Sequence, residues 1–126
     1  MRRGEVWTAA HGPGYAGKPR PVVVIQDDHF TGTDSVTICA FTTDPVNAPL
    51  FRIPVAASES NGLRAASQLM VDKIVTVARQ RLRKRIGRLE DEYLVRLNRA
   101  IAVFLGLAVS RRAPGPRGSA VISRRV

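Results

Sequence analysis

The residue best placed for chemistry is Arg20, which lies between two prolines at the edge of an apolar run. Pro19 and Pro21 restrict the backbone on both sides of it, because proline fixes φ and donates no backbone hydrogen bond. The β-branched run 22–25 that follows is typical of a buried strand. Arg20 is therefore expected where a constrained loop meets the core. A guanidinium held that rigidly is costly to keep without a use, although an ordinary surface arginine is the plain alternative.

The charge balance indicates what such an arginine would meet. Twenty Lys and Arg oppose ten Asp and Glu, so the 126-residue chain carries a net charge of +10. Five arginines lie within residues 111–126, and residues 1–110 still carry a net charge of +5. Body and tail are both basic, which favours a polyanionic or acidic partner. Charge alone does not distinguish RNA, DNA, an anionic membrane and an acidic protein.

Size and composition predict one domain in a reducing compartment. Cys39 is the single cysteine and lies in an apolar-alternating run, so it is expected to be a small buried residue. No apolar stretch follows Met1-Arg2-Arg3, and the run 100–109 is shorter than the ~20 residues that span a bilayer. These features predict a cytoplasmic protein without a membrane segment.

Short alternating segments predict a mainly β fold. Strands are expected at 5–9, 20–26, 35–42, 50–55 and 67–77, the last bent near Asp72-Lys73, with a helical turn and a further strand within 79–88. Pro54 suggests an edge strand. The segment 11–19 holds three glycines and two prolines, which is typical of a loop.

One helix is expected after the strands. Glu90-Asp91-Glu92 suits a helix N-terminus, and an apolar stripe continues to Ala108, with a second half expected to be deeply buried or in a subunit contact. The chain is therefore interpreted as a small, mostly antiparallel β-barrel or curved sheet with a packed helix over 1–109, followed by a basic tail at 110–126.

Several motifs together carry a resemblance to a known family. Over residues 4–108 the chain resembles the MazF/PemK family of toxin–antitoxin ribonucleases. Five pieces match in order: GEVW at 4–7, GKPRPVVVIQ at 17–26, FTT at 41–43, VDKIVTV at 71–77 and KRIGRL at 84–89. Each motif alone is weak, and their common order and spacing make the resemblance specific.

The resemblance implies a fold and a reaction. Family members are small homodimers with an SH3-like, CcdB-type β-barrel, and they cleave single-stranded RNA at short sequences without a metal or another cofactor. The 2′-hydroxyl attacks, leaving a 2′,3′-cyclic phosphate and a 5′-hydroxyl, and an acidic antitoxin segment silences the toxin. By resemblance, the catalytic residues are Arg20 and Thr42. A guanidinium can stabilise the phosphorane, and a threonine hydroxyl can hold the phosphate.

The general base stays open. The first loop is shorter than in many relatives, and its segment 12–17 has no carboxylate. Asp72 is the best remaining carboxylate, with a structural turn or salt-bridge role as its equal alternative. His11 could act as acid or base near neutral pH, and His29 is a weaker candidate.

Further residues are expected to bind RNA. Tyr15 offers a stacking surface and Lys18 a phosphate contact, while Thr43, Gln68 and Lys73 follow the matched motifs. The basic run 79–88 could extend the groove, although such runs are usually solvated faces. The tail arginines are expected to add sequence-independent affinity.

Two other functions remain as alternatives. The same barrel occurs in a CcdB-like topoisomerase (gyrase) poison, and a basic RNA-binding module without catalysis is the third hypothesis. Arg20→Ala separates the first hypothesis from the third, because it would abolish cleavage in one and change only affinity in the other. The substrate, whether mRNA, tRNA or rRNA, is left undecided.

Overall fold

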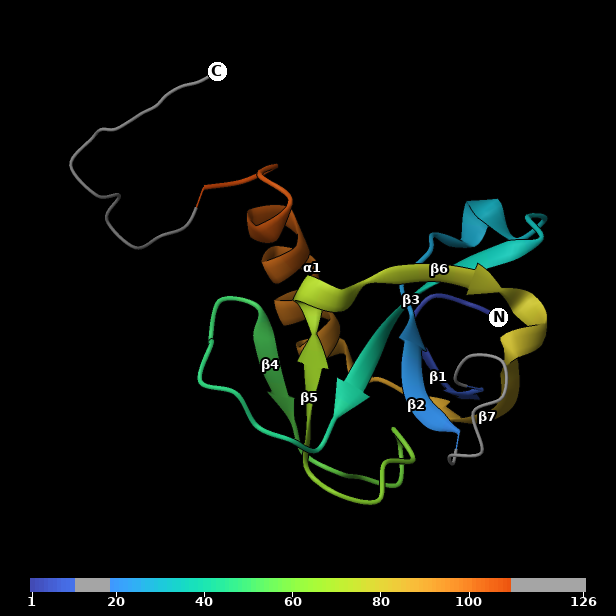
Figure 1. Cartoon of the computed structure of the whole chain (residues 1–126), viewed down its shortest axis with the longest axis horizontal. Helices are drawn as coiled ribbons and strands as arrows, with labels where there is room; N and C mark the ends of the chain where they lie inside the picture. Colours follow the sequence, from blue (N-terminus) through green and yellow to red (C-terminus); the bar gives the residue numbers. More distant parts are fainter. Residues whose placement is uncertain (11–18, 110–126) are drawn as a thin grey trace.

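A curved antiparallel sheet with one helix packed against it forms the body of the protein (Figure 1). The computed structural model describes residues 1–10 and 19–109. In chain order the elements are β1 (Glu5–Ala9), β2 (Arg20–Val24), η1 (Asp28–Phe30), β3 (Ser35–Thr42), β4 (Arg52–Val55), β5 (Ser67–Met70), η2 (Val71–Lys73), β6 (Val75–Ala78), η3 (Arg79–Arg81), β7 (Leu82–Arg88) and α1 (Asp91–Phe104), where η marks a short 3-10 helix.

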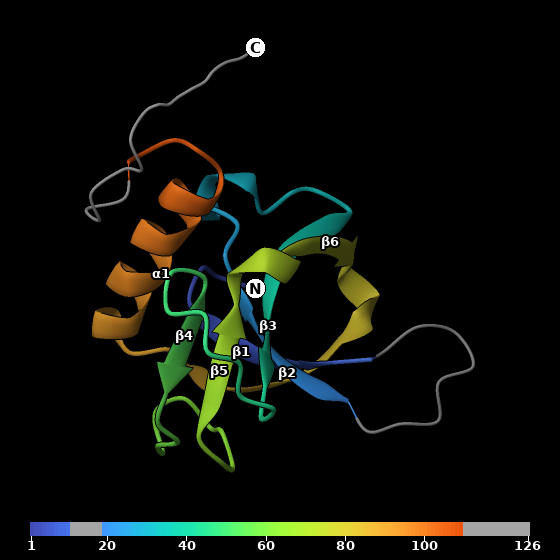
Figure 2. The same cartoon turned by 60° about the vertical axis from the view of Figure 1, so that its left-hand side comes forward.

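β3 is the strand around which the sheet is organised. The strands follow the order β4-β5-β3-β2-β1-β7, and every pairing is antiparallel. Residues 35–38 of β3 pair with β6, whereas Phe41 and Thr42 pair with β5. Figure 2 shows β5 and β6 diverging from the two halves of β3. The predicted mainly β fold with a C-terminal helix is confirmed. In the described ranges no pairing joins β4 to β7, so the sheet is curled and not closed, and β6 branches from β3 beside the main path.

The two faces of the sheet bury different sets of side chains, because successive residues of a strand point to opposite faces. Val23 and Cys39 join Leu97 of α1 in the larger core, which defines the helix-covered face. Val22 and Ile38 belong to a second cluster on the other face. We call this second face concave, since side chains from β1, β2, β3, β6 and β7 converge there.

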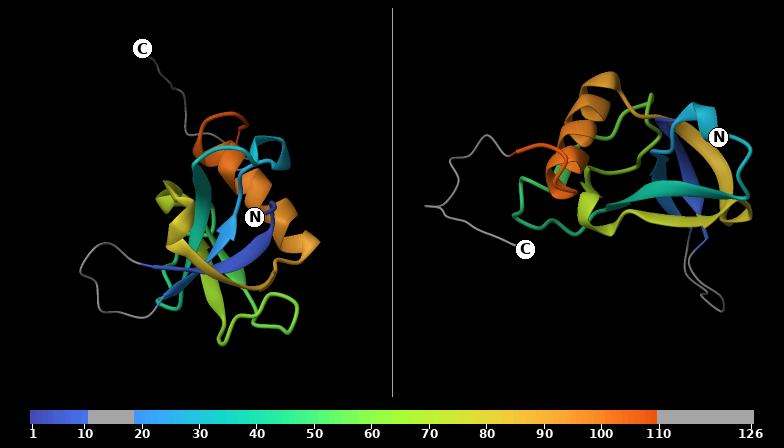
Figure 3. Two further views of the ribbon diagram at one scale, coloured as in Figure 1. Left: turned by 90° about the vertical axis from the view of Figure 1, so that its right-hand side faces the viewer. Right: turned by 90° about the horizontal axis from the view of Figure 1, so that it is seen from above.

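The helix covers the β4–β5 end of the sheet, away from the corner where β6 leads into β7 (Figure 3). Its stripe buries Leu97 and Ala100 as predicted. It ends at Phe104 rather than continuing to Ala108, because Gly106 adopts a φ of +77°, which breaks helical geometry. No helix in the described part of the chain is both long and apolar enough to cross a membrane.

The end of α1 also departs from the sequence-based expectation of deep burial. Phe104, Leu105 and Leu107 are 48, 60 and 78% exposed. The sequence pattern identifies apolar side chains that favour burial. It does not say whether the same chain or another one covers them.

The other strand predictions hold with small shifts. The bent segment 67–77 is broken by η2 at the predicted Asp72-Lys73, and a helical turn does precede β7. The fourth strand begins at Arg52 rather than Leu50. Among residues 1–10 and 19–109, β4 pairs only with β5, so Pro54 does lie on an edge strand.

The loop between β4 and β5 is locked onto β7 and the start of α1. The fully buried Asn61 donates from Nδ2 to the carbonyl of Ala56 and to Oε1 of Glu90, at 2.9 and 3.1 Å. Gly62 adopts a φ of +73°, and a Cβ there would overlap the carbonyl oxygen of Ile86. This close approach fixes the loop that leads into β5.

Candidate active site

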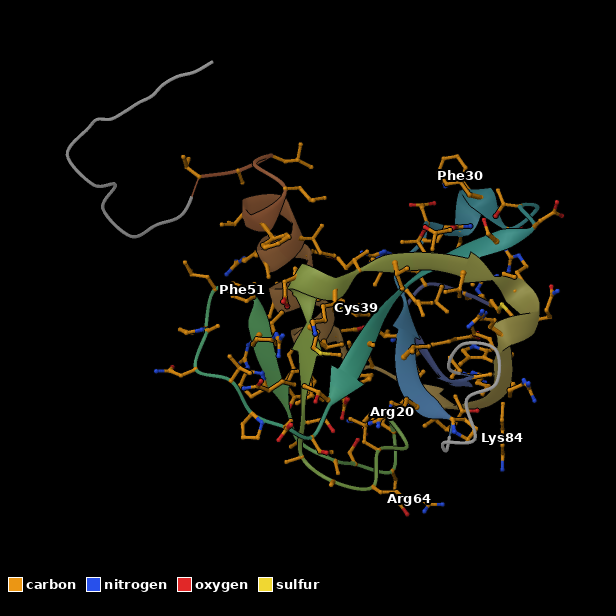
Figure 4. All side chains as sticks on the ribbon, viewed as in Figure 1. Arg20, Phe30, Cys39, Phe51, Arg64 and Lys84 are labelled. Carbon is orange, nitrogen blue, oxygen red and sulfur yellow. The ribbon has the colours of Figure 1, made fainter. Side chains whose placement is uncertain are left out.

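Arg20 and Thr42 lie at the adjacent ends of two paired central strands, β2 and β3. The β2–β3 register pairs Val22 with Ala40, and continuing it by two residues sets Arg20, the first residue of β2, opposite Thr42, the last of β3. Cross-strand partners share a face of a sheet, so both side chains lie on the concave face. Arg20 is exposed and stands at the free end of β2 (Figure 4).

The Thr42 hydroxyl is held by the backbone that follows it. Its Oγ1 accepts a hydrogen bond of 3.1 Å from the amide of Asp44. A hydroxyl that accepts from a backbone amide keeps its own proton available to donate. Thr42 can therefore donate toward an anion placed between β2 and β3.

A cavity of about 160 Å³ opens on the concave face beside Arg20. Its walls are apolar, with Val22, Ile38 and Ala40 among them, and Arg20 and Arg81 are its charged lining residues. Neither arginine forms an ion pair with any carboxylate of residues 1–10 or 19–109. An apolar hollow with two uncompensated guanidinium groups suits a ligand that combines a ring with negative charge, such as a nucleotide. A larger cavity of about 260 Å³, between α1 and residues around β4, contains none of the predicted site residues.

The structure adds Arg81, which lines the cavity, to the residues predicted for the site. From the sequence it is one of six basic residues in the run 79–88, with nothing to distinguish it. Its carbonyl accepts from the amide of Ala10 at 2.9 Å, which brings η3 next to the end of β1. Only the pairing of β1 with β7, distant in sequence, could have indicated this position.

Asp72 lies in η2, which packs against α1 and β4, and its carboxylate is engaged by Arg52. In the β4–β5 ladder Arg52 pairs with Met70, and Pro54 pairs with Gln68. Met70 and Gln68 are two residues apart on β5, so Arg52 and Gln68 lie on the same face of the sheet. Arg52 Nε and Nη2 donate to the two carboxylate oxygens of Asp72 at 2.8 and 3.1 Å. This hydrogen bonding lowers the pKa of Asp72 below its ordinary value of 3.8 and raises the pKa of Arg52. Of the two roles expected for Asp72, the geometry favours the structural one, since a carboxylate with a depressed pKa is a weak base.

The predicted RNA-binding residues are distributed unevenly. Thr43 is exposed directly after Thr42, and Gln68 is the β5 partner of Thr42, so both lie at the site. The Gln68 amide, however, is bonded to the backbone of Val46. Lys73 is exposed at the end of η2, beyond the far end of β5. The structure does not bring Lys73 next to Arg20.

The remaining candidates lie elsewhere. Tyr15, Lys18 and His11 fall outside the described residues. His29 lies in η1, at the opposite end of β2 and β3 from Arg20, where its Nδ1 is 2.6 Å from Oδ1 of Asp27. His29 is therefore not part of this site.

Basic side chains continue from the site along the edge strand β7. Arg85 is paired with Glu5 and Arg88 with Asp91, both at 3.3 Å. Arg83 and Lys84 are exposed and have no ion-pair partner within the described ranges (Figure 4 labels Lys84). Charged residues also protect an edge strand from pairing with another chain, so this row has a structural use of its own.

Comparison with known proteins places the chain in a family. Residues 2–105 match the family described as PemK-like, MazF-like toxin of type II toxin-antitoxin systems, and the chain belongs to it. It is 51% identical over 108 residues to the probable endoribonuclease MazF of Mycolicibacterium smegmatis, covering 86% of this chain and 99% of that one. The resemblance predicted from the five motifs is thus confirmed.

Solved structures agree at the level of the fold. An endoribonuclease from a mycobacterial species, in complex with its cognate antitoxin, superposes with a TM-score of 0.70 at 23% identity, covering 87% of this chain and 99% of that one. A MazE–MazF complex from Deinococcus radiodurans gives a TM-score of 0.66 at 17% identity, with 84% and 95% covered.

Proposed function

We propose that this toxin is an endoribonuclease that cleaves single-stranded RNA at specific sequences, without a metal, at the concave-face edge between β2 and β3. The observation that supports the proposal is that Arg20 and Thr42 lie at the adjacent ends of the paired strands β2 and β3, with Arg20 and a second arginine lining an apolar cavity there. The family membership and the 51% identity to a probable endoribonuclease support it.

The proposed reaction uses a nucleophile supplied by the substrate. The 2′-oxygen attacks the adjacent phosphorus, a new P–O2′ bond forms, and the P–O5′ bond breaks to leave a 2′,3′-cyclic phosphate and a 5′-hydroxyl. One proton leaves the 2′-hydroxyl and one reaches the departing 5′-oxygen, so no net proton is consumed. DNA lacks the 2′-hydroxyl, which confines the reaction to RNA.

Arg20 and Thr42 take different parts in this step. The phosphorane carries more negative charge on its non-bridging oxygens than the ground state does. Arg20 can stabilise that charge with several charge-assisted hydrogen bonds. Thr42 donates to one of the same oxygens and keeps the phosphate in line with the 2′-oxygen. The general base is proposed to come from a residue other than Asp72, because both oxygens of Asp72 are bonded to Arg52.

The same cationic site suits an acidic antitoxin. Arg20 and Arg81 have no carboxylate partner among the described residues and can bind the side chains of an acidic peptide as readily as phosphates. An antitoxin that occupies this edge would exclude RNA. The related endoribonuclease solved with its cognate antitoxin supports such a partner.

We also propose a homodimer in the cytoplasm. The exposed apolar end of α1 gives a surface for a second copy, and a single buried thiol suits a reducing compartment. Exposed bases are proposed to contact Thr43 and, beyond the described residues, Tyr15 and Lys18.

The test is cleavage of a long single-stranded RNA in EDTA, with chemical identification of the new ends and a DNA of the same sequence as control. Discrete RNA fragments ending in 2′,3′-cyclic phosphate, with intact DNA, are expected. RNA that stays whole, or fragments with 5′-phosphate ends, would contradict the proposal.

A further inference from the structure

Gln68 is bound to the loop that follows Thr42 through both ends of its side-chain amide. Its Oε1 accepts from the amide of Val46 at 3.0 Å, and its Nε2 donates to the carbonyl of Val46 at 3.1 Å. The side chain thus makes the pair of hydrogen bonds that a backbone partner makes in an antiparallel ladder. Gln68 is also the cross-strand partner of Thr42.

The loop that Gln68 holds has few other supports. Residues 43–47 are all exposed, so they bury no apolar anchor. Within the described residues, their other hydrogen bonds are local: the amide of Asp44 donates to Thr42 Oγ1 at 3.1 Å, and the Val46 carbonyl accepts from Ala48 at 3.0 Å. An exposed loop with only local bonds samples many conformations unless a rigid element holds it.

These contacts form a short chain that ends at a site residue. Gln68 lies in β5, and its side chain is hydrogen-bonded to the backbone of Val46. Val46 is two residues from Asp44, so fixing Val46 limits where the Asp44 amide can lie. The Asp44 amide in turn sets the orientation of the Thr42 hydroxyl. Misplacing a reacting group by about 1 Å can cost on the order of 100-fold in rate, so such a link matters to catalysis.

We infer that Gln68 is a positioning residue, which acts through Val46 and Asp44 to aim the Thr42 hydroxyl at the phosphate. The inference rests on the proposed function, in which Thr42 donates to a non-bridging oxygen. It differs from the sequence-based expectation that Gln68 contacts RNA. Half of the hydrogen-bonding capacity of the amide is already used by Val46.

The test compares Gln68→Met, which keeps the length of the side chain without its amide, with Gln80→Met as the matched control. Gln80 is exposed in η3 and outside the site. Single-turnover cleavage is measured over a range of RNA concentrations. Gln68→Met is expected to lower the maximal rate about tenfold, with the half-saturating RNA concentration and the cleavage sequence unchanged. Gln80→Met is expected to match the wild type.

A double-mutant cycle with Thr42→Val separates positioning from a general structural effect. If Gln68 acts through the Thr42 hydroxyl, Gln68→Met should change the rate by less than about twofold once that hydroxyl is gone, because coupled residues are not additive. Rate losses that multiply in the double variant would overturn the inference. A raised half-saturating concentration or a changed cleavage sequence would assign Gln68 to RNA contact instead.

Amide hydrogen exchange tests the link without any cleavage. Gln68→Met is expected to speed exchange of the Val46 and Asp44 amides at least tenfold, and that of amides inside β2 not at all. Unchanged protection at Val46 and Asp44 would overturn the inference on its own. If wild-type protein cleaves no RNA, the proposed function fails, and this exchange measurement still decides whether Gln68 holds the loop.

Discussion

Arg52 and Asp72 form a two-point ion pair that ties β4 to η2, with N–O distances of 2.8 and 3.1 Å. The side chains are 9 and 23% exposed, so the pair is largely withdrawn from water. A planar guanidinium and a carboxylate joined by two parallel bonds have a defined relative geometry. The pair thus fixes the turn between β5 and β6 against the edge strand.

Asp72→Asn should reduce stability far more than it reduces catalysis. Removing one partner leaves Arg52 with an uncompensated charge, and the partial exposure of Asp72 moderates the loss to about 2–3 kcal/mol. Urea unfolding measures this loss, with the exposed Asp34→Asn as control. At a temperature where both proteins are folded, cleavage should fall by less than about threefold. Loss of a general base costs on the order of 100-fold or more, and such a drop would restore Asp72 to a catalytic role.

The same ion pair predicts a dependence of stability on acid. The pKa of Asp72 is lower in the folded protein than its ordinary value of 3.8, because Arg52 donates hydrogen bonds to the carboxylate. Its contribution is therefore present above pH 3.8 and is lost as the pH falls through the lower folded value. Urea unfolding at several pH values between 6 and 2.5 should show Asp72→Asn and wild type converging at the acid end. A difference that stays constant over this range would contradict the ion-pair account.

Gly62→Ala should destabilise the fold strongly. The positive φ is strained for alanine, and the new Cβ would overlap the Ile86 carbonyl oxygen, so a loss of about 3 kcal/mol is expected. Gly32→Ala is the matched control, since a Cβ there meets nothing within 4 Å and should be nearly neutral. Thermal unfolding of both variants measures the difference. Equal melting temperatures would contradict the close packing of this loop on β7.

The sequence predicts structure set by neighbouring residues better than it predicts contacts between distant segments. Local patterns predict most strands, the bend at Asp72-Lys73 and the position of Arg20, because alternation and proline act on neighbouring residues. Contacts between distant segments carry no such signal. The pairing of Arg52 with Asp72 and of Gln68 with Val46 depends on how β4, β5 and the loop after β3 come together.

The end of α1 is a second feature that the sequence does not predict fully. Its apolar residues predict a buried surface, and the single chain leaves Phe104, Leu105 and Leu107 exposed. Whether a second copy covers them is a property of the assembly, which the sequence pattern of one chain does not contain. The helix boundary is not evident from the sequence, because Gly106, which ends the helix, lies inside an otherwise apolar run.

Leu105→Lys should weaken the proposed homodimer. A lysine at this exposed apolar position would have to lose its hydration in the interface. Sedimentation at micromolar concentration should give a dimer for the wild type and a shift toward monomer for the variant. Val95→Lys, on an exposed position nearer the start of α1, should remain dimeric. A wild-type monomer would contradict the proposal.

The most direct test of the catalytic account compares Arg20→Ala with Arg83→Ala in single-turnover RNA cleavage in EDTA. Arg83 is an exposed arginine of β7 without an ion-pair partner in the described chain. Arg83→Ala therefore removes the same positive charge as Arg20→Ala, but at a position away from the site. We expect Arg20→Ala to lose at least about 100-fold in the maximal rate while still binding RNA, because a donor to the transition state is gone. Arg83→Ala should change mainly affinity. If Arg20→Ala cleaved at the wild-type maximal rate, or if both variants lost only affinity, Arg20 would not be the residue that stabilises the phosphorane.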